Sequence, residues 1–267
     1  MKKLLLCMLI LFSICLTSCG HKMLSRDEQF IVAMECAYAP FNWTEVLKTD
    51  TNYRIKGTRL YAEGYDVQMA KKIADGLGKT LVIKALDWNG LIPALQNGQV
   101  DALICGMSPT DERKLSVDFT AAYYTSTHVL LMPKDSKFIN GKTLSDFEGA
   151  NAVGQQGTLY DSLIDQLVNV NHQTPLADVP TIITALNSKR SDLTILEEPV
   201  AMGIIANNPG FTYITLEEGF NVSEEDIAVS IALKKDSELR EQINKILAGI
   251  SEEERANIMK KAVGENK

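Results

Sequence analysis

The sequence predicts an α/β protein with two lobes of similar plan. Strand-like apolar runs alternate with helical patterns along the 267 residues, which is typical of βαβ units and a mostly parallel sheet. The stretch 91–104, LIPALQNGQVDALI, also matches 182–195, IITALNSKRSDLTI, at a constant offset. Two helix–strand units can look alike by chance, but two related lobes are the better interpretation. The aligned pairs are Ile92 and Ile183, Ala94 and Ala185, Leu95 and Leu186, Asp101 and Asp192, and Ile104 and Ile195.

The first half of the chain divides into short strands and helices. QFIVAMEC (29–36) is typical of a buried strand and is followed by an aromatic turn, YAPFNW (38–43). A helix is predicted over 64–79, because its apolar residues recur at helical spacing and Gly78 fits the position after a helix end. The remaining predictions are a strand over 80–86, a short helix over 89–98 with Asn89 as N-cap and Gly98 as terminator, and a strand over 101–106.

The second half of the chain repeats this alternation of strands and helices before its C-terminal part returns to the first lobe. An extended β-rich run, 121–132, is the predicted boundary between the lobes, and a second helix–strand set fills 143–220. A strand is predicted over 226–235, and 236–262 is predicted to be helix with an apolar stripe. We expect this C-terminal part to return to the first lobe, which leaves two crossing segments as a hinge and a cleft suited to a small ligand. The stripe consists of Leu239, Ile243, Ile246, Leu247 and Ile250.

The N-terminus has the features of a targeting segment. A basic MKK precedes an apolar run, LLLCMLILFSICL, that is too short to span a bilayer comfortably. LTSC (16–19) then resembles the bacterial lipobox, which implies cleavage after residue 18 and a lipidated Cys19, with palmitate among the acyl groups, that anchors the chain outside the cytoplasmic membrane. The alternative is an ordinary secretory signal with an incidental cysteine. Residues 19–28 are polar and are predicted to form a tether.

The charge and the histidine spacing argue against a nucleic-acid partner and a metal site, and the cysteines offer at most one disulfide. The net charge of −7 argues against a nucleic-acid partner, whose phosphates require Lys/Arg patches. After cleavage, Cys36 and Cys105 are left besides Cys19; they can form a disulfide in an export compartment, but two separate, partly buried thiols are the favoured interpretation. The three histidines, His21, His128 and His172, have no metal-ligand spacing, so no metal is expected. A structural role is favoured for His128.

The stretch GMSPTDERK (106–114) follows a predicted strand and contains a helix start near Thr110 or Asp111. Unpaired backbone N–H groups at a helix start favour an anion, and Arg113 can donate two hydrogen bonds to a carboxylate. The alternative is that Thr110 only caps the helix while Arg113 pairs with a surface acid such as Asp118. Spacing alone does not separate these two interpretations.

Several motifs together resemble one known family. They are YAPF, GYDVQMAKKIADGLG, DWNGLIPALQNGQVDALICGMSPTDERKLSVDFTAAYY and GQQGT. Their order and spacing, from Phe30 to Lys261, are similar to those of the polar amino-acid solute-binding proteins of ABC transporters, of the histidine- and glutamine-binding type. The resemblance implies a two-lobed, periplasmic-binding-protein-like fold of type II. Each lobe would be a mixed sheet flanked by helices, with a two-strand hinge, and the lobes would close over one free amino acid.

The resemblance also implies which residues hold the acid end of that amino acid. Arg113 would clamp the α-carboxylate, with help from the backbone N–H of Thr110. Thr158 and the N–H of Leu159 would meet the same carboxylate from the other lobe.

The amine end has one departure from the family pattern. Ser108 and the carbonyl of Gly106 would receive the α-ammonium group, with Cys105 at the edge of the contact set. The family usually places an Asp in the second lobe to pair with this ammonium, whereas LEEPVA here supplies Glu197. The carboxylate is kept on a side chain one methylene longer, so the role survives and its geometry is open. FTAAYY also lacks the Pro often found before the tyrosines, which affects hinge detail only.

Four residues would meet the side chain of the ligand. By the resemblance, Tyr38 and Trp88 sandwich its aliphatic part, while Gln155 and Glu35 reach its distal polar group. This pair favours a cationic or amide side chain, such as that of Arg, Lys, His or Gln, because an acidic side chain would be repelled. The alternatives are core packing for Trp88 and a solvated position on the rim of the cleft for Glu35.

The resulting prediction is a monomeric, lipid-anchored receptor outside the cytoplasm that delivers an amino acid to the permease subunits of an ABC importer, without catalysis or cofactor. The predicted divisions are a signal peptide (1–18), a tether (19–28), lobe 1 (29–124 and 228–267) and lobe 2 (125–227). One alternative is an enzyme on the same fold, such as a cyclohexadienyl or arogenate dehydratase-like protein, with Glu35 or Glu197 as its acid. The other is a ligand-sensing surface module with an unused cleft.

Overall fold

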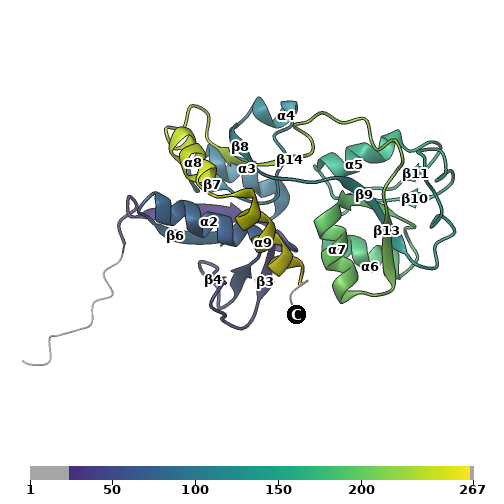
Figure 1. The fold of residues 1–267 in the computed structure, drawn as a ribbon, viewed down its shortest axis with the longest axis horizontal. Helices are drawn as coiled ribbons and strands as arrows, with labels where there is room; N and C mark the ends of the chain where they lie inside the picture. Colours follow the sequence, from purple (N-terminus) through teal and green to yellow (C-terminus); the bar gives the residue numbers. More distant parts are fainter. Residues whose placement is uncertain (1–23, 265–267) are drawn as a thin grey trace, which may run out of the picture.

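The computed structural model describes residues 24–264, which form two lobes connected by extended segments (Figure 1). The predicted signal peptide, the lipobox Cys19 and most of the tether lie outside these residues. No helix among residues 24–264 is long and apolar enough to cross a membrane. The predicted lobe boundaries at residues 124/125 and 227/228 stay predictions, and the lobes are described here by their sheets.

The first lobe is built on a five-stranded and a four-stranded sheet. Its elements are β1 (Gln29–Met34), β2 (Ala37–Tyr38), β3 (Asn42–Glu45), β4 (Tyr53–Arg54), β5 (Tyr61–Glu63), α2 (Tyr65–Gly76), β6 (Thr80–Ala85), α3 (Trp88–Gln96), β7 (Ala102–Leu103), α4 (Asp111–Lys114), β8 (Asp118–Thr125), β14 (Ala228–Leu233), α8 (Leu239–Ala248) and α9 (Glu252–Val263). The larger sheet has the order β6-β1-β7-β14-β8. The C-terminal part therefore returns to the first lobe, as predicted.

The second lobe contains a three-stranded sheet, β12-β9-β13, and a separate pair, β10-β11. Its elements are β9 (His128–Pro133), β10 (Asn151–Ala152), α5 (Leu159–Leu163), the 3-10 turn η1 (Ile164–Gln166), β11 (Asn171–His172), α6 (Val179–Asn187), β12 (Thr194–Glu197), α7 (Glu198–Asn207) and β13 (Phe211–Ile214). Helices flank the strands in both lobes (Figure 1).

The expectation of mostly parallel sheets is wrong for both lobes, because the four-stranded sheet of the first lobe is antiparallel throughout. In the first lobe β1 pairs in parallel with β6 and β7, but β14 runs antiparallel to β7 and β8. In the second lobe β9 runs antiparallel to both β12 and β13. The reason is the hinge. The chain crosses from one lobe to the other immediately before β9 and before β14, and each of these strands runs antiparallel to the strands beside it. The second lobe combines this antiparallel sheet with the parallel pair β10–β11, so both lobes carry mixed pairing, as the resemblance implied.

The internal repeat is confirmed by two matching helices. α3 and α6 have the same length and occupy equivalent positions at the repeat offset, and Asp87 and Asp178 are their N-cap residues. Asp101 Oδ2 accepts a hydrogen bond from the N–H of Ile31 at 2.7 Å, and Asp192 Oδ2 accepts one from the N–H of Asn151 at 2.8 Å. Each aspartate thus fixes the end of a helix–strand unit to the neighbouring strand.

Two predicted helix ends are wrong. α3 begins at Trp88 rather than after Asn89, because the chain turns into the helix at Asp87, whose carbonyl accepts from the N–H of Gly90 at 2.8 Å. The predicted C-terminal helix is two helices. α8 ends at Ala248 with Gly249 as its C-cap, and the hydroxyl of Ser251 accepts from the N–H of Glu254 at 3.1 Å to start α9. Ser followed three residues later by Glu is a known helix-start signature, and it is present in the sequence.

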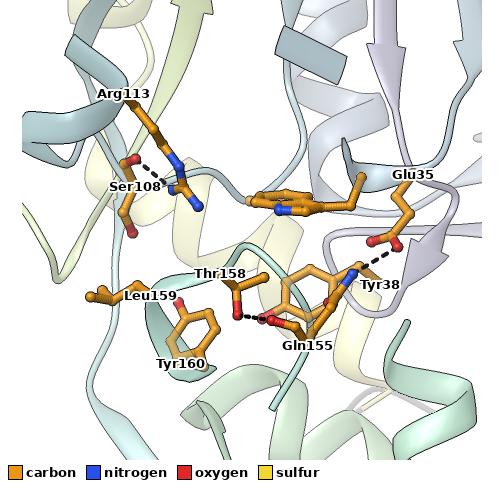
Figure 2. Close-up of a pocket in the computed structure, with 10 residues that line it drawn as sticks. Glu35, Tyr38, Ser108, Arg113, Gln155, Thr158, Leu159 and Tyr160 are labelled. Atoms are coloured by element: carbon orange, nitrogen blue, oxygen red, sulfur yellow. Dashed lines mark hydrogen bonds between the residues drawn. The ribbon is translucent and has the colours of Figure 1, made fainter. Parts of the chain in front are cut away.

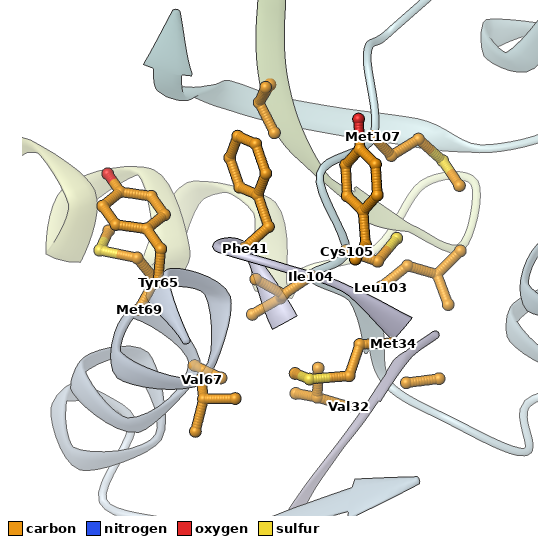
Figure 3. Packing of buried hydrophobic residues seen from close by; sticks show 14 of the residues in the cluster. Val32, Met34, Phe41, Tyr65, Val67, Met69, Leu103, Ile104, Cys105 and Met107 are labelled. Atoms are coloured by element: carbon orange, nitrogen blue, oxygen red, sulfur yellow. The ribbon is translucent and has the colours of Figure 1, made fainter. Parts of the chain in front are cut away.

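The apolar core of the first lobe lies directly behind the turn at 106–114. Figure 3 shows Val32, Met34 and Leu103 packed together with Phe41 and Tyr65. All of these side chains are buried. Fully burying side chains of this size contributes roughly 1.5–3 kcal/mol each, so the turn is mounted on a rigid base.

The C-terminal α9 packs against α2 and also against α7 of the second lobe, which adds a third bridge between the lobes.

Candidate functional site

A cavity lies between the two lobes, and both lobes supply its walls (Figure 2). The lobes meet so closely that about 10 Å³ is left for the centre of a water molecule, which is about the space that one water needs. Admission of an amino acid therefore requires the lobes to move apart. The lining residues are Glu35, Tyr38, Trp88, Gly106, Ser108, Arg113, Gln155, Thr158, Leu159 and Tyr160.

All but three of the residues predicted for the site line this cavity. Cys105 is buried just before Gly106, in the core behind the wall. Thr110 caps α4, and Glu197 lies beside the cavity, where it receives a hydrogen bond from Tyr38. Tyr160 lines the cavity and was not predicted. The sequence contained a signal for Tyr160, because this residue lies in the first turn of the helix that Thr158 begins, at the helix end that faces the cleft.

Arg113 is held by its own turn and aimed into the cavity. Thr110 caps α4 by accepting from the N–H of Arg113 at 3.4 Å. The guanidinium donates to the carbonyl of Ser108 at 2.9 Å and, across the cleft, to the carbonyl of Gly157 at 3.3 Å. It also lies 5.2 Å from the centre of the Trp88 ring, a cation–π distance. Two contacts leave other N–H donors of the fork available for a ligand.

The charge of Arg113 has no carboxylate partner among residues 24–264. Asp118, the surface acid considered from the sequence, pairs with Lys235 at 2.9 Å instead. Burial lowers the pKa of Arg113 from its usual value, because a cation removed from water without a countercharge is destabilised. A half-buried, unpaired guanidinium at a cavity wall is suited to an anionic group such as a carboxylate.

Gly106 and Ser108 shape the wall next to Arg113. Gly106 has φ +66°, and a Cβ there would lie 3.1 Å from the ring of Tyr38, so glycine permits both the backbone bend and the close approach of the ring. The hydroxyl of Ser108 donates to the carbonyl of Asp226 at 3.0 Å. A hydroxyl that donates one hydrogen bond keeps its acceptor lone pairs, so Ser108 can still receive a donor from the cavity.

The second lobe contributes the turn that follows β10. Thr158 caps α5: its hydroxyl accepts from the N–H of Asp161 at 3.4 Å and donates to the carbonyl of Gln155 at 2.7 Å. Leu159 is the first residue of α5, so its N–H lies at the helix end that faces the cavity. The cap also fixes Gly157, whose carbonyl receives the indole N–H of Trp88 at 3.0 Å.

Glu35 and Gln155 meet at the opposite end of the cavity from Arg113 (Figure 2). Gln155 Nε2 donates to Glu35 Oε1 at 2.8 Å and to the carbonyl of Ala177 at 3.1 Å. Burial raises the pKa of Glu35 to about 7; the amide of Gln155 opposes the shift, and the negative charges of Asp178 and Asp87 add to it. This end of the cavity therefore carries negative potential, while the Arg113 end is positive.

Glu197 is enclosed more completely. Its side chain is 1% exposed, Tyr38 donates a hydrogen bond to Oε2, and Oε1 has no partner among the described atoms. Burial raises the pKa of Glu197 to about 8. Because Tyr38 belongs to the first lobe and Glu197 to the second, this hydrogen bond joins the lobes.

A buried polar network supports the first-lobe wall from behind. Asp66, in the first turn of α2, is fully buried and accepts from the hydroxyl of Tyr123 at 2.6 Å and from Asn42 Nδ2 at 2.8 Å. The Tyr123 oxygen accepts from the N–H of Gly106 at 3.3 Å, and Asn42 Oδ1 accepts from the N–H of Cys36 at 2.7 Å. One carboxylate thus ties together the two loops that carry the site.

The remaining predicted features are structural. Cys36 and Cys105 are separate, buried thiols, which is the interpretation favoured from the sequence. His128 begins β9 and packs its ring against Tyr160 and Phe220. Burial lowers the pKa of His128 to about 4, so it is neutral near pH 7. No group of three metal-ligating side chains occurs among residues 24–264.

The chain matches one protein family over most of its length. The profile of the bacterial extracellular solute-binding proteins, family 3, matches residues 30–265. The arginine-binding extracellular protein ArtP of Bacillus subtilis is 30% identical over 259 residues, which cover 92% of each chain. A probable histidine-binding protein of Campylobacter jejuni is 31% identical over 172 residues, 64% of this chain and 61% of that one.

A solved structure has the same fold. It is the substrate-binding protein of an amino acid ABC transporter from Streptococcus pneumoniae, bound to L-arginine. The two structures superpose with a TM-score of 0.77 at 28% sequence identity, over 89% of this chain and 94% of that one.

Proposed function

The chain belongs to the bacterial extracellular solute-binding proteins of family 3, and we propose that it binds one free amino acid between its lobes and delivers it to an ABC importer. The observation that carries this proposal is Arg113, a cavity-lining guanidinium without a carboxylate partner among residues 24–264. The N-terminal end of α5 faces it from the other lobe. Both groups favour a carboxylate, and they close on it from two sides.

The ligand that suits the cavity best has a cationic or amide side chain. Glu35 and Gln155 lie at the end of the cavity away from Arg113, and Asp178 and Asp87 add negative potential there. The relatives named above are called an arginine-binding extracellular protein and a probable histidine-binding protein. We therefore expect arginine, lysine, histidine or glutamine to bind, and aspartate or glutamate to be rejected because their carboxylates would face Glu35.

Binding calorimetry against the twenty amino acids tests this function. A cationic or amide amino acid should bind with one site per chain, and Arg113→Ala should abolish that binding. Glu112→Gln is a matched control, because Glu112 also lies in α4 and does not line the cavity. Absence of binding to all twenty amino acids would refute the proposal.

We further propose that the protein is held at the outer face of the membrane by lipid on Cys19 and acts as a monomer. The LTSC motif supports the anchor, although Cys19 lies outside the described residues. Expression with an alkyne-tagged fatty acid should label the wild-type protein, and Cys19→Ala should lose the label and leave the membrane fraction. Light scattering of the chain from residue 24 onward should give the mass of one chain.

A second candidate function has one observation in its favour. Burial holds the pKa of Glu35 at about 7 and that of Glu197 at about 8, and protonated carboxyl groups beside a cavity are typical of general acids. Proton NMR of the bound amino acid separates the two functions. Recovery of the unchanged ligand after long incubation supports the receptor, and conversion of the ligand supports an enzyme.

A further inference from the structure

The carboxyl group of Glu197 is buried, and one of its two oxygens has no hydrogen-bond partner among the described atoms. Glu197 ends β12 and is the residue that precedes α7. Tyr38 donates to Oε2, whereas Oε1 is buried without any partner among the described atoms. An unpartnered carboxyl oxygen beside a cavity needs a donor, because a buried acceptor left unsatisfied keeps the full penalty of its desolvation.

No cation accompanies this group among residues 24–264. Tyr38 of β2 is hydrogen-bonded to it, and the titratable side chains on the elements that pack against β12 are His128 of β9, Tyr160 and Asp161 of α5 and Glu198 of α7. Asp161 pairs with His172 at 2.9 Å. His128 is directly opposite Glu197 in the sheet, but burial holds its pKa at about 4, so it carries no charge at neutral pH. Glu198 is a like charge that Tyr213 and Thr127 engage through hydrogen bonds at 2.9 and 3.2 Å.

An ionised Glu197 would therefore be a buried charge without a countercharge. Burial of an unpaired carboxylate is strongly unfavourable, and a protein avoids this cost by keeping the group protonated. The raised pKa of about 8 agrees with this geometric argument. An α-ammonium group at Oε1 would reverse the situation, since it supplies both the missing donor and the missing positive charge.

We propose that Glu197 is protonated before the ligand binds and that the α-ammonium group, on reaching Oε1, expels this proton to solvent. The O–H bond of the carboxylic acid breaks heterolytically, water or buffer takes the proton, and the carboxylate accepts hydrogen bonds from the ammonium at Oε1 and from Tyr38 at Oε2. This inference rests on the proposed amino-acid binding function and makes Glu197 a site of pH control over it.

The proposal fixes how affinity depends on pH. Because only the ionised carboxylate pairs with the ammonium, the Kd should fall about tenfold for each unit that pH rises. This trend should flatten near pH 8, where the carboxyl group is already ionised in the free protein. Near pH 7, binding should release about one proton from this group.

Glu35 is a second acid at the cavity, so its protons must be separated from those of Glu197. Its pKa of about 7 means that a cationic side chain could also displace a proton there. The test therefore uses the Glu35→Gln background with L-arginine and L-glutamine as probes. A proton released by the α-ammonium should appear equally with both probes, since both carry the same ammonium group.

The experiment is calorimetry at pH 7 in phosphate, HEPES and imidazole, whose different ionisation enthalpies reveal proton release. The Glu35→Gln protein should release about one proton per ligand bound. Adding Glu197→Gln should abolish the release and weaken binding strongly at pH 8.5 but little at pH 5.5, where the parent has itself lost affinity. Glu198→Gln is the matched control, because it alters the adjacent carboxylate and should leave the proton release unchanged.

Three outcomes would contradict the inference, and they are distinguishable from failure of the proposed function. Binding enthalpies that are identical in all three buffers would show that no proton is released. Equal proton release with and without Glu197→Gln would show that another group loses the proton. If Glu197→Gln left the difference in affinity between pH 5.5 and 8.5 unchanged, Glu197 would not be the cause of the pH dependence. Absence of binding by any variant to any amino acid would instead refute the receptor function, and with it this inference.

Discussion

Tyr123 donates its hydroxyl hydrogen to Asp66 Oδ1 at 2.6 Å, and both groups are buried beneath the loops that carry the candidate site. The same tyrosine oxygen accepts from the N–H of Gly106, and the other oxygen of Asp66 accepts from Asn42. Gly106 lines the cavity itself. A contact in the core thus determines where the wall of the site lies.

Tyr123→Phe should destabilise the protein by about 2–3 kcal/mol, because it leaves Asp66 and the N–H of Gly106 each short of one buried hydrogen bond. Urea denaturation measures this loss. Tyr124→Phe is the control: the neighbouring hydroxyl has no hydrogen-bond partner among residues 24–264, so its removal should cost under about 0.5 kcal/mol. Equal losses in the two variants would show that the Asp66 network does not support the fold.

Arg113→Lys should weaken amino-acid binding about 100-fold or more. The charge is kept, but lysine cannot present two parallel N–H donors or lie flat over Trp88, and hydrogen bonds to charged groups contribute roughly 1.5–3 kcal/mol each. Titration calorimetry gives the change in Kd. Unchanged affinity would refute the clamp.

Gly106→Ala should reduce both stability and affinity. Its φ of +66° is strained for alanine, and the added Cβ would lie 3.1 Å from the ring of Tyr38. The ring, whose hydroxyl donates to Glu197, must then shift to make room. We expect the free energy of unfolding to fall by about 1 kcal/mol. The free energy of amino-acid binding should fall by a larger fraction of its parent value. Gly98→Ala is the matched control for strain, because Gly98 has a similar φ of +68° but nothing lies within 4 Å of its added Cβ. Equal effects on affinity would contradict the role given to Tyr38.

His172 should make stability depend on pH near neutrality. Its ring nitrogens lie 2.8 Å from Asp165 Oδ1 and 2.9 Å from Asp161 Oδ1, and both nitrogens donate only in the charged imidazolium. Partial burial lowers the pKa, but hydrogen bonds to Asp161 and Asp165 outweigh it, so the pKa is raised above 6.5. The native state therefore binds the proton more tightly, and its contribution is full below pH 6.5 and disappears as pH rises through the raised pKa.

The measurement is the free energy of unfolding between pH 5 and 9 for the parent and for His172→Gln. The parent should lose stability as pH rises through the raised pKa, and this decrease should be absent from the variant. His128→Gln is the comparison, since that ring is buried and neutral near pH 7 and its removal should leave the slope in this range unchanged. Parallel curves for the parent and His172→Gln would contradict the ion-pair role.

Much of the fold was predictable because it depends on local pattern and composition. Apolar spacing located α2, Gly78 and Gly98 marked helix ends with positive φ, and the repeat placed α3 and α6 at the same offset. The predictions that failed depended on longer-range geometry. The antiparallel insertion of β9 follows from the hinge crossing, which no local pattern encodes.

The sequence by itself determined the two-lobe plan, the Thr110–Arg113 turn and the family motifs, since each of these follows from residue types at short spacing. Only the tertiary structure decided how the two halves of the site meet. It placed Gln155 against Glu35, Tyr38 against Glu197 and Gly157 against Arg113, across separations of more than 40 residues. It also decided that Glu197 is buried without a cation among the described residues. The physical reason is that burial and charge compensation depend on everything that surrounds a group, whereas the sequence specifies only its neighbours along the chain.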